Sequence, residues 1–225
     1  MGIVKFILRP FAGFIRYGAL KIMKKFRQPD DKRPVIAVSD HILNEIVLPS
    51  VFNVFRENKF RELARFKKLP VSEHDRIFNE LESAGVCLAI FYLNTAKLLA
   101  RSGDYHFWQD TEEHLSKQLQ KILIGFGVDG SNAKLMRQLI EMRYAEYEEL
   151  AKKVWDANDE VDKKTDFKSL PSEMKRIAAA IEATAIGTTD HIRRGEIEEK
   201  DHLIKYLIEW LLFLNRRIGR FIRNL

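Results

Sequence analysis

The stretch from Ser72 to Leu99 places the tightest limit on how this chain of 225 residues can fold. It opens with Ser72 and Asp75 in an S-x-x-D pattern, which predicts a helix N-terminus. The 14 residues of 83–96 then carry no charge, and apolar side chains fall on nearly every side of the predicted helix. A helix that is apolar all round must be enclosed by other elements. The sequence therefore predicts a helix over 72–99 at the centre of a bundle.

The rest of the chain also repeats with a helical period, and no segment alternates long enough to predict a strand. Caps, prolines and glycines divide it into helices over 10–26, 39–67 with a kink at Pro49, 105–124, 131–158, 171–194 and 196–223. The predicted fold class is all-α, an irregular bundle of about seven helices. Because 28–34 contains two prolines and four charges, we expect an N-terminal helix within 1–29 and a single bundle domain over 30–225.

The apolar spacing also predicts which faces turn inward. In helix 131–158 the spacing predicts five apolar residues on the inner face: Leu135, Leu139, Met142, Leu150 and Trp155. Its two tyrosines, Tyr144 and Tyr147, fall among charged residues and are predicted to face solvent. Helix 171–194 carries small residues that would let a neighbouring helix approach closely: Ala178, Ala179, Ala183 and Gly187.

The first 29 residues form a basic, amphipathic segment without a single acidic residue before Asp30. When it is wound as a helix, apolar residues share one arc and cations gather opposite them, a pattern suited to an anionic surface. Pro10 divides the segment into a short apolar piece and the helix proper. The residues expected to dock are Lys5, Ile7, Arg9, Phe11, Phe14, Arg16, Lys21, Lys24 and Lys25.

The last predicted helix has a second basic face, which carries Arg216, Arg217 and Arg220. Its opposite side is a leucine-rich stripe, and Leu212 and Phe213 extend apolar surface beyond that stripe. Two interpretations stay open: a core helix whose basic end complements its own dipole, or a second docking surface. The charge layout is uneven, since residues 1–29 carry +7, residues 203–225 carry +4 and the part between them is acidic.

Several motifs resemble functional sites but fail their structural requirements. The run from Gly125 to Gly130 matches G-x-G-x-x-G, yet a predicted helix rather than a strand precedes it, so helix capping is the better interpretation. A calcium loop from Asp156 fails at its sixth and twelfth positions, which are Val161 and Phe167.

The remaining candidate residues stand singly. A lone E-x-x-H ends at His202, and Asp110 with His114 is a single pair, so no metal site is predicted. Cys87, the one cysteine, lies in an uncharged stretch that would raise its pKa, which disfavours a nucleophile. The sequence therefore predicts no catalytic residue, no cofactor and no metal.

These features favour a non-enzymatic, peripheral membrane-associated protein. We expect an accessory or scaffold subunit that docks on an anionic membrane surface, on a membrane-bound partner protein, or on both. No transmembrane helix is predicted, and the expected location is the cytoplasmic face of a membrane, with mitochondria as the alternative.

Two other functions stay open. The bundle could bind, or act on, a lipid or quinone-like apolar ligand in a cavity near Phe91, Tyr92, Phe107, Trp108 and Ala179. Nucleic-acid binding through the basic termini is disfavoured, because Phe and Ile rather than polar base-reading residues accompany the N-terminal cations.

Overall fold

The computed structural model describes residues 35–100, 104–162, 171–196, 198 and 201–225, without the side chains of 158–162. The predicted docking helix in 1–29 and its linker lie outside this part. Within it, every regular element is helical: α3 (Val35–His41), η1 (Ile42–Val47), α4 (Leu48–Arg56), α5 (Asn58–Leu63), η2 (Phe66–Lys68), α6 (Val71–Leu99), α7 (Tyr105–Gly125), α8 (Gly130–Asp162), α9 (Ser172–Arg193) and α10 (His202–Arg223). The predicted fold class, an all-α helical bundle, is confirmed.

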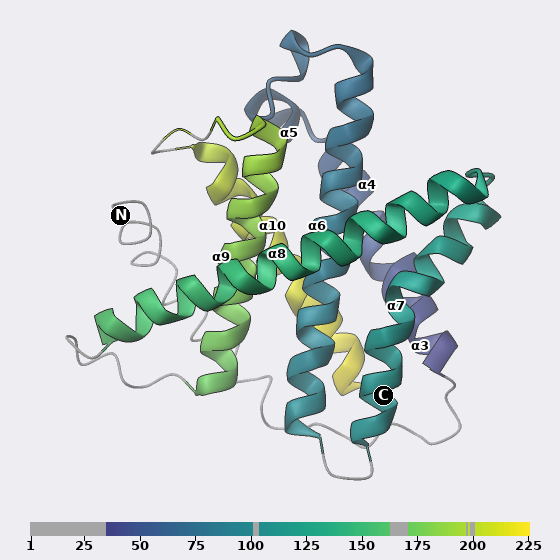
Figure 1. Ribbon diagram of the computed structural model, residues 1–225, viewed down its shortest axis with the longest axis vertical. Coiled ribbons are helices and arrows are strands. Elements are labelled where there is room, and N and C mark those ends of the chain that lie inside the picture. Colours follow the sequence, from purple (N-terminus) through teal and green to yellow (C-terminus); the bar gives the residue numbers. More distant parts are fainter. Residues whose placement is uncertain (1–34, 101–103, 163–170, 197, 199–200) are drawn as a thin grey trace.

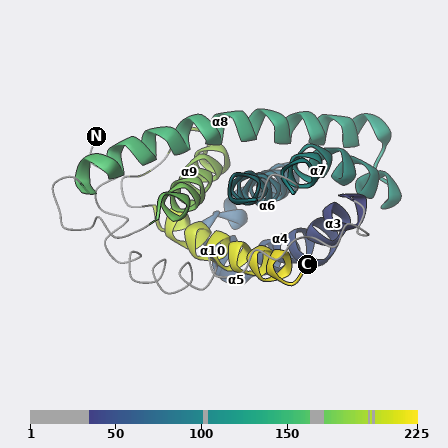
Figure 2. The same ribbon diagram turned by 90° about the horizontal axis from the view of Figure 1, so that it is seen from below.

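The helices lie in three layers (Figure 2). α8 alone forms one outer layer, and it crosses α9, α6 and α7, which lie side by side in the middle (Figures 1 and 2). α10, together with α3 and α4, forms the other outer layer. A single long helix therefore covers one side of the bundle, and the first and last described helices cover the other.

α6 occupies the centre, as the sequence predicts. Every residue from Glu80 to Leu93 is buried. Gly85 lets neighbouring helices approach, because a Cβ atom there would lie 2.9 Å from Cγ1 of Val47 in η1. Burying so long a segment on all sides requires contributions from both outer layers.

The predicted single helix over 39–67 is wrong in its details. It begins earlier, at Val35, passes through the π-helical segment η1, and breaks at the extended residue Glu57 (φ −68°, ψ 126°). Pro49 lies in the first turn of α4 and has no N–H for the carbonyl of Glu45, four residues earlier. The Arg217 side chain of α10 donates to that Glu45 oxygen over 2.9 Å, so a distant helix satisfies the acceptor.

The stretch from Val35 to Arg56 is also long and apolar enough, by length and composition, to cross a membrane. The prediction of no transmembrane helix did not anticipate this stretch. Half of its most apolar window is buried inside the bundle, as in a core helix.

The glycine-rich run at 125–130 joins two helices, as the capping interpretation predicts. Gly127 has φ +87° and ends α7, and the N–H of Val128 donates to Leu123 O over 2.9 Å. Asp129 caps α8 by accepting from the N–H of Ser131 over 2.8 Å, so the helix begins one residue before the predicted start at 131. α8 then continues to Asp162, beyond the predicted helix end at residue 158. The helical backbone from Asp156 to Asp162 agrees with the rejection of a calcium loop in this segment.

The predicted inner face of α8 is only partly correct, since Leu139 packs against the core but two other members do not. Leu135 and Met142 are 60% and 56% exposed, whereas Tyr147, predicted to face solvent, is fully buried. Tyr147 fits because Gly187 of α9 has no side chain, and a Cβ atom there would overlap the tyrosine ring. The prediction that Gly187 allows a close helix approach is thus confirmed. The buried face of α8 consists of Ala133, Met136, Ile140, Tyr147 and Val154.

α10 begins later than predicted, at His202, where the Asp201 carboxylate accepts from the N–H of Leu203 over 2.9 Å. The predicted leucine stripe is buried: Leu203, Leu207, Leu211, Leu214 and Ile218 are each fully inaccessible. Phe213 remains 49% exposed, as the apolar surface outside the stripe suggested.

Candidate functional site

The predicted docking residues of α10 differ in their surroundings. Arg216 and Arg220 are exposed, whereas Arg217 is partly buried and bonded to Glu45 O. Arg223, at the end of α10, turns inward, and its Nη1 atom is buried without a partner among the described residues. Two of the predicted cations of α10 therefore remain accessible as docking groups.

The C-terminal end of α10 packs beside the place where the described chain begins. The rings of His41 at the end of α3 and Phe221 of α10 stack with centroids 4.0 Å apart. The bond from Arg217 to Glu45 O lies one turn farther along the same pair of segments. Residues 1–34 therefore join the bundle at the end that also carries Arg216 and Arg220.

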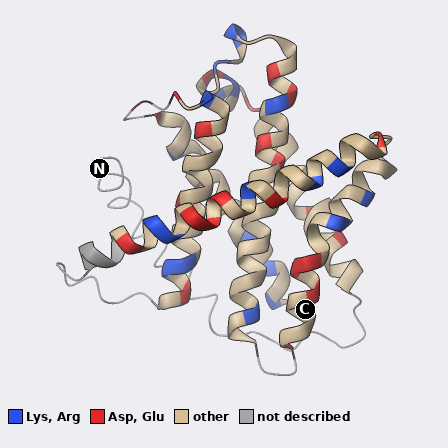
Figure 3. Cartoon of the chain, viewed as in Figure 1, with Lys and Arg blue, Asp and Glu red and all other residues tan. Residues whose placement is uncertain are grey.

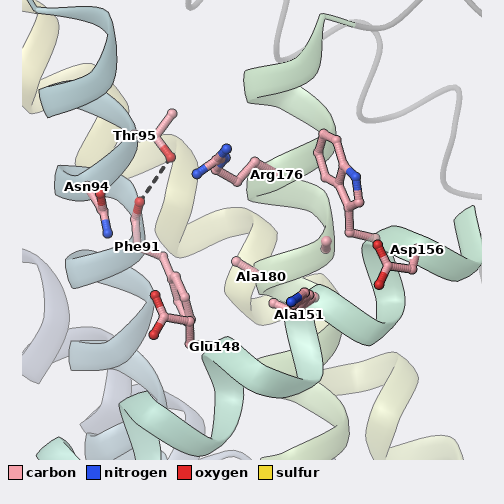
Figure 4. A pocket seen from close by; sticks show the side chains of 11 residues that line it. Phe91, Asn94, Thr95, Glu148, Ala151, Asp156, Arg176 and Ala180 are labelled. Atoms are coloured by element: carbon pink, nitrogen blue, oxygen red, sulfur yellow. Dashed lines mark hydrogen bonds between the residues drawn. The ribbon is translucent and has the colours of Figure 1, made fainter. Parts of the chain in front are cut away.

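A second feature is a groove of about 370 Å³ between α6, α8 and α9 (Figure 4). Its apolar lining comes from Phe91 of α6, from Ala151 and Trp155 of α8, and from Ala179 and Ala180 of α9. Phe91 also packs against Tyr144, with ring centroids 4.8 Å apart. Small residues on two helices thus leave space beside a fixed aromatic ring.

The edge of the groove is polar. Asn94 and Thr95 line it from α6, Arg176 from α9, and Glu148, Lys152 and Asp156 from α8. The Thr95 hydroxyl donates a hydrogen bond to Phe91 O (3.0 Å), and the Asn94 amide donates one to Tyr144 OH (3.3 Å). None of the four charged groups has a hydrogen bond or ion pair with another described residue.

This groove matches only part of the cavity that an apolar ligand was expected to need. Phe91 and Ala179 line it, but Tyr92 and Trp108 are each 2% exposed within the packed core, and Phe107 packs against that core. The space is an open groove with a charged edge instead of an enclosed apolar pocket.

Two buried carboxyl groups were missed by the sequence analysis. Glu82 of α6 and Glu182 of α9 are each 2% exposed, and at least one carboxyl oxygen of each is buried without a hydrogen-bond partner in the described part. Burial raises the pKa of both groups to about 7. Neither lines the groove. Nothing in the sequence distinguishes them from the many surface glutamates at helical spacing.

The expected lack of a catalytic or metal-binding cluster stays a prediction for the whole chain. Over the residues that the structure describes, no group of three or more His, Cys, Asp or Glu side chains could hold a metal ion. Burial raises the pKa of Cys87 well above its ordinary range, in the predicted direction. The thiol contacts Ile140 O at 3.7 Å, which suits a packed core residue.

Two histidines near helix ends contact polar groups. His74 lies 3.1 Å from Phe66 O, and His191 lies 2.9 Å from the carboxylate oxygens of Glu146.

Comparison with known proteins adds no assignment: no protein family, no curated protein and no solved structure matches this chain. The fold and the chemistry of its surfaces therefore carry the functional argument.

Proposed function

We propose that this protein is a non-enzymatic accessory or scaffold subunit that docks peripherally on an anionic membrane surface through its basic termini. One observation carries the proposal: the stacking of His41 on Phe221 places the entry of the N-terminal segment and the exposed Arg216 and Arg220 at one end of the bundle. Two basic segments at opposite ends of the sequence can then contact one surface together.

The charge and apolar content at this end suit such a surface. Residues 1–29 carry +7, and each Lys or Arg near an anionic bilayer contributes about 1 kcal/mol. Ile36, in the first turn of α3, is 49% exposed at the same end. Apolar side chains that enter the interface add to the electrostatic attraction.

The rest of the bundle is suited to a protein partner rather than to nucleic acid. Residues 30–202 carry a net charge of −5, and Figure 3 shows Lys and Arg interspersed with Asp and Glu on the side that displays α8. A nucleic-acid-binding domain would present one broad basic surface. The proposed location is the cytoplasmic face of a membrane, where anionic lipids are concentrated, with mitochondria as the alternative.

Co-sedimentation with liposomes tests the proposal. The full chain should bind vesicles that contain phosphatidylserine, bind purely zwitterionic vesicles weakly, and lose binding as salt is added. The double variant R216Q/R220Q should weaken binding about thirtyfold, and removal of residues 1–29 should weaken it further.

The matched control is K67Q/K68Q, which removes two exposed charges from η2, beside the N-terminal half of α6. That variant should bind as the unaltered protein does. Equal losses in the two double variants would indicate attraction by net charge alone, and retention of full binding without residues 1–29 would overturn the proposal.

A further inference from the structure

The groove between α6, α8 and α9 has the size of a small-ligand site. Its volume of about 370 Å³ lies toward the lower end of the range of such sites, roughly 300–1,000 Å³. Three alanines, Ala151, Ala179 and Ala180, create the space, and the aromatic side chains of Phe91 and Trp155 border it. Ligand sites combine apolar and aromatic surface with a few polar groups in this way.

The charges on the two sides of the groove are arranged differently. On α8, Glu148, Lys152 and Asp156 follow one another at intervals of four residues, so Lys152 has a carboxylate one turn away on either side. This row has a net charge of −1. An acidic group on a ligand is therefore repelled by the two ends of the row.

Arg176 stands on the opposite side, on α9. Its guanidinium extends from α9 toward Thr95 of α6 (Figure 4). It makes no hydrogen bond or ion pair with another described residue, so its donors are available to a ligand. A guanidinium binds a carboxylate, sulfonate or phosphate through paired hydrogen bonds, which fixes the ligand's orientation.

We infer that this groove binds a small organic acid with a flat apolar body, whose acidic group pairs with Arg176 while its body lies against Phe91 and Trp155. The charge arrangement sets the orientation: the acid points to α9 and away from Glu148 and Asp156. The site is on the α8 side of the bundle and is independent of the proposed membrane docking.

Dye binding to the full chain tests this site. Anilinonaphthalene sulfonate has a flat apolar body and one anionic group, and phenylnaphthylamine is a similar body without the charge. The sulfonate should bind the unaltered protein more tightly. Arg176→Gln should weaken the sulfonate about tenfold and leave the uncharged dye within about twofold.

Two further variants localise the effect. Ala151→Leu should weaken both dyes, since it fills the space that they share. Arg56→Gln removes an exposed arginine from α4, on the other side of the bundle, and should change neither affinity. Circular dichroism and thermal melting should show that all three variants remain folded.

The inference is overturned if a cationic dye of similar size binds more tightly than the sulfonate. It is equally overturned if Arg176→Gln weakens both dyes alike, or if Ala151→Leu weakens neither. Mass spectrometry of the purified protein provides a direct check, in which a co-purifying organic acid that is lost from Arg176→Gln would support the site.

Discussion

The two sides of α6 hold buried carboxylates in opposite ways. Toward α8, Glu80 accepts two hydrogen bonds from Arg143, over 2.9 Å to Nε and 2.8 Å to Nη2. Arg143 also contacts Glu146, which in turn contacts His191 of α9, so hydrogen-bonded polar side chains link three helices. Glu82 lies two residues after Glu80 and on the opposite side of α6. One of its carboxyl oxygens is buried without a hydrogen-bond partner among the described residues.

The difference shows that two carboxyl groups buried to the same extent on one helix can have different hydrogen-bond partners. Glu80 and Glu82 are 4% and 2% exposed. Burial raises the pKa of Glu82, and that of Glu182 of α9, to about 7. A bidentate partner compensates for the loss of water around Glu80. The unpartnered groups can instead take up a proton near neutral pH.

Removal of the ion pair between Glu80 and Arg143 should have the largest effect on the free energy of unfolding. Glu80→Ala leaves the mostly buried Arg143 guanidinium without its main partner and should cost about 3 kcal/mol or more of unfolding free energy. Urea denaturation at neutral pH measures this change. The double variant E80M/R143M, which removes both charges at once, should cost much less than the single change. A loss below about 1 kcal/mol in Glu80→Ala would show that the ion pair is not a main contact between α6 and α8.

The unpartnered carboxyl groups of Glu82 and Glu182 should make the stability of the protein depend on pH. The unfolded pKa of Glu82 and of Glu182 is 4.5 and the folded pKa is about 7, so the folded protein binds more protons between these values. Their contribution to the free energy of unfolding is fully present below pH 4.5 and is lost as pH rises to about 7. The loss is on the order of 3 kcal/mol for each group.

Urea denaturation of E82Q/E182Q at a series of pH values measures this contribution. The double variant should be more stable than the unaltered protein near pH 8 and should differ little near pH 5. If the two proteins lose stability in parallel over this interval, other groups cause the dependence and the two glutamates have acquired partners.

A third glutamate of α6 should give the smallest effect, in the opposite pH direction. Glu73, in the first turn, accepts hydrogen bonds from Arg194 and Arg76, which lower its pKa to about 2. Its contribution is present above pH 4.5 and is lost as pH falls toward 2. Glu73→Gln should therefore slightly lower the thermal midpoint at neutral pH, with the difference vanishing in acid. The control Glu62→Gln removes an exposed carboxylate of α5 and should leave the midpoint unchanged.

Much of the fold could be predicted from local pattern. α6 and α7 begin and end within about a residue or two of the predicted positions, because apolar period, capping residues and turn glycines act within a few residues of each other. The burial of the middle of α6 follows from its lack of charge. The start of α10 was predicted too early, because the capping Asp201 is bonded to Arg193, a contact between two helices.

The candidate sites were less predictable. The exposed Arg216 and Arg220 follow from the amphipathic pattern of α10. Arg217 is instead bonded to Glu45 O, and the Nη1 atom of Arg223 is buried. The groove has no local signature, since its alanines, aromatic residues and Arg176 come from three helices. Its position depends on how closely those helices approach one another.

By itself, the sequence determined that this chain is helical, that α6 is central and that all charged residues among the first 29 are basic. Periodicity, charge and caps are local properties, so they can be identified without the fold. Only the tertiary structure decided which face of α8 is buried, because Tyr147 needs the space left by Gly187 on another helix. It likewise decided which carboxylates are paired and which cations remain exposed. Those outcomes depend on partners far apart in the chain, and no periodicity within one helix encodes them.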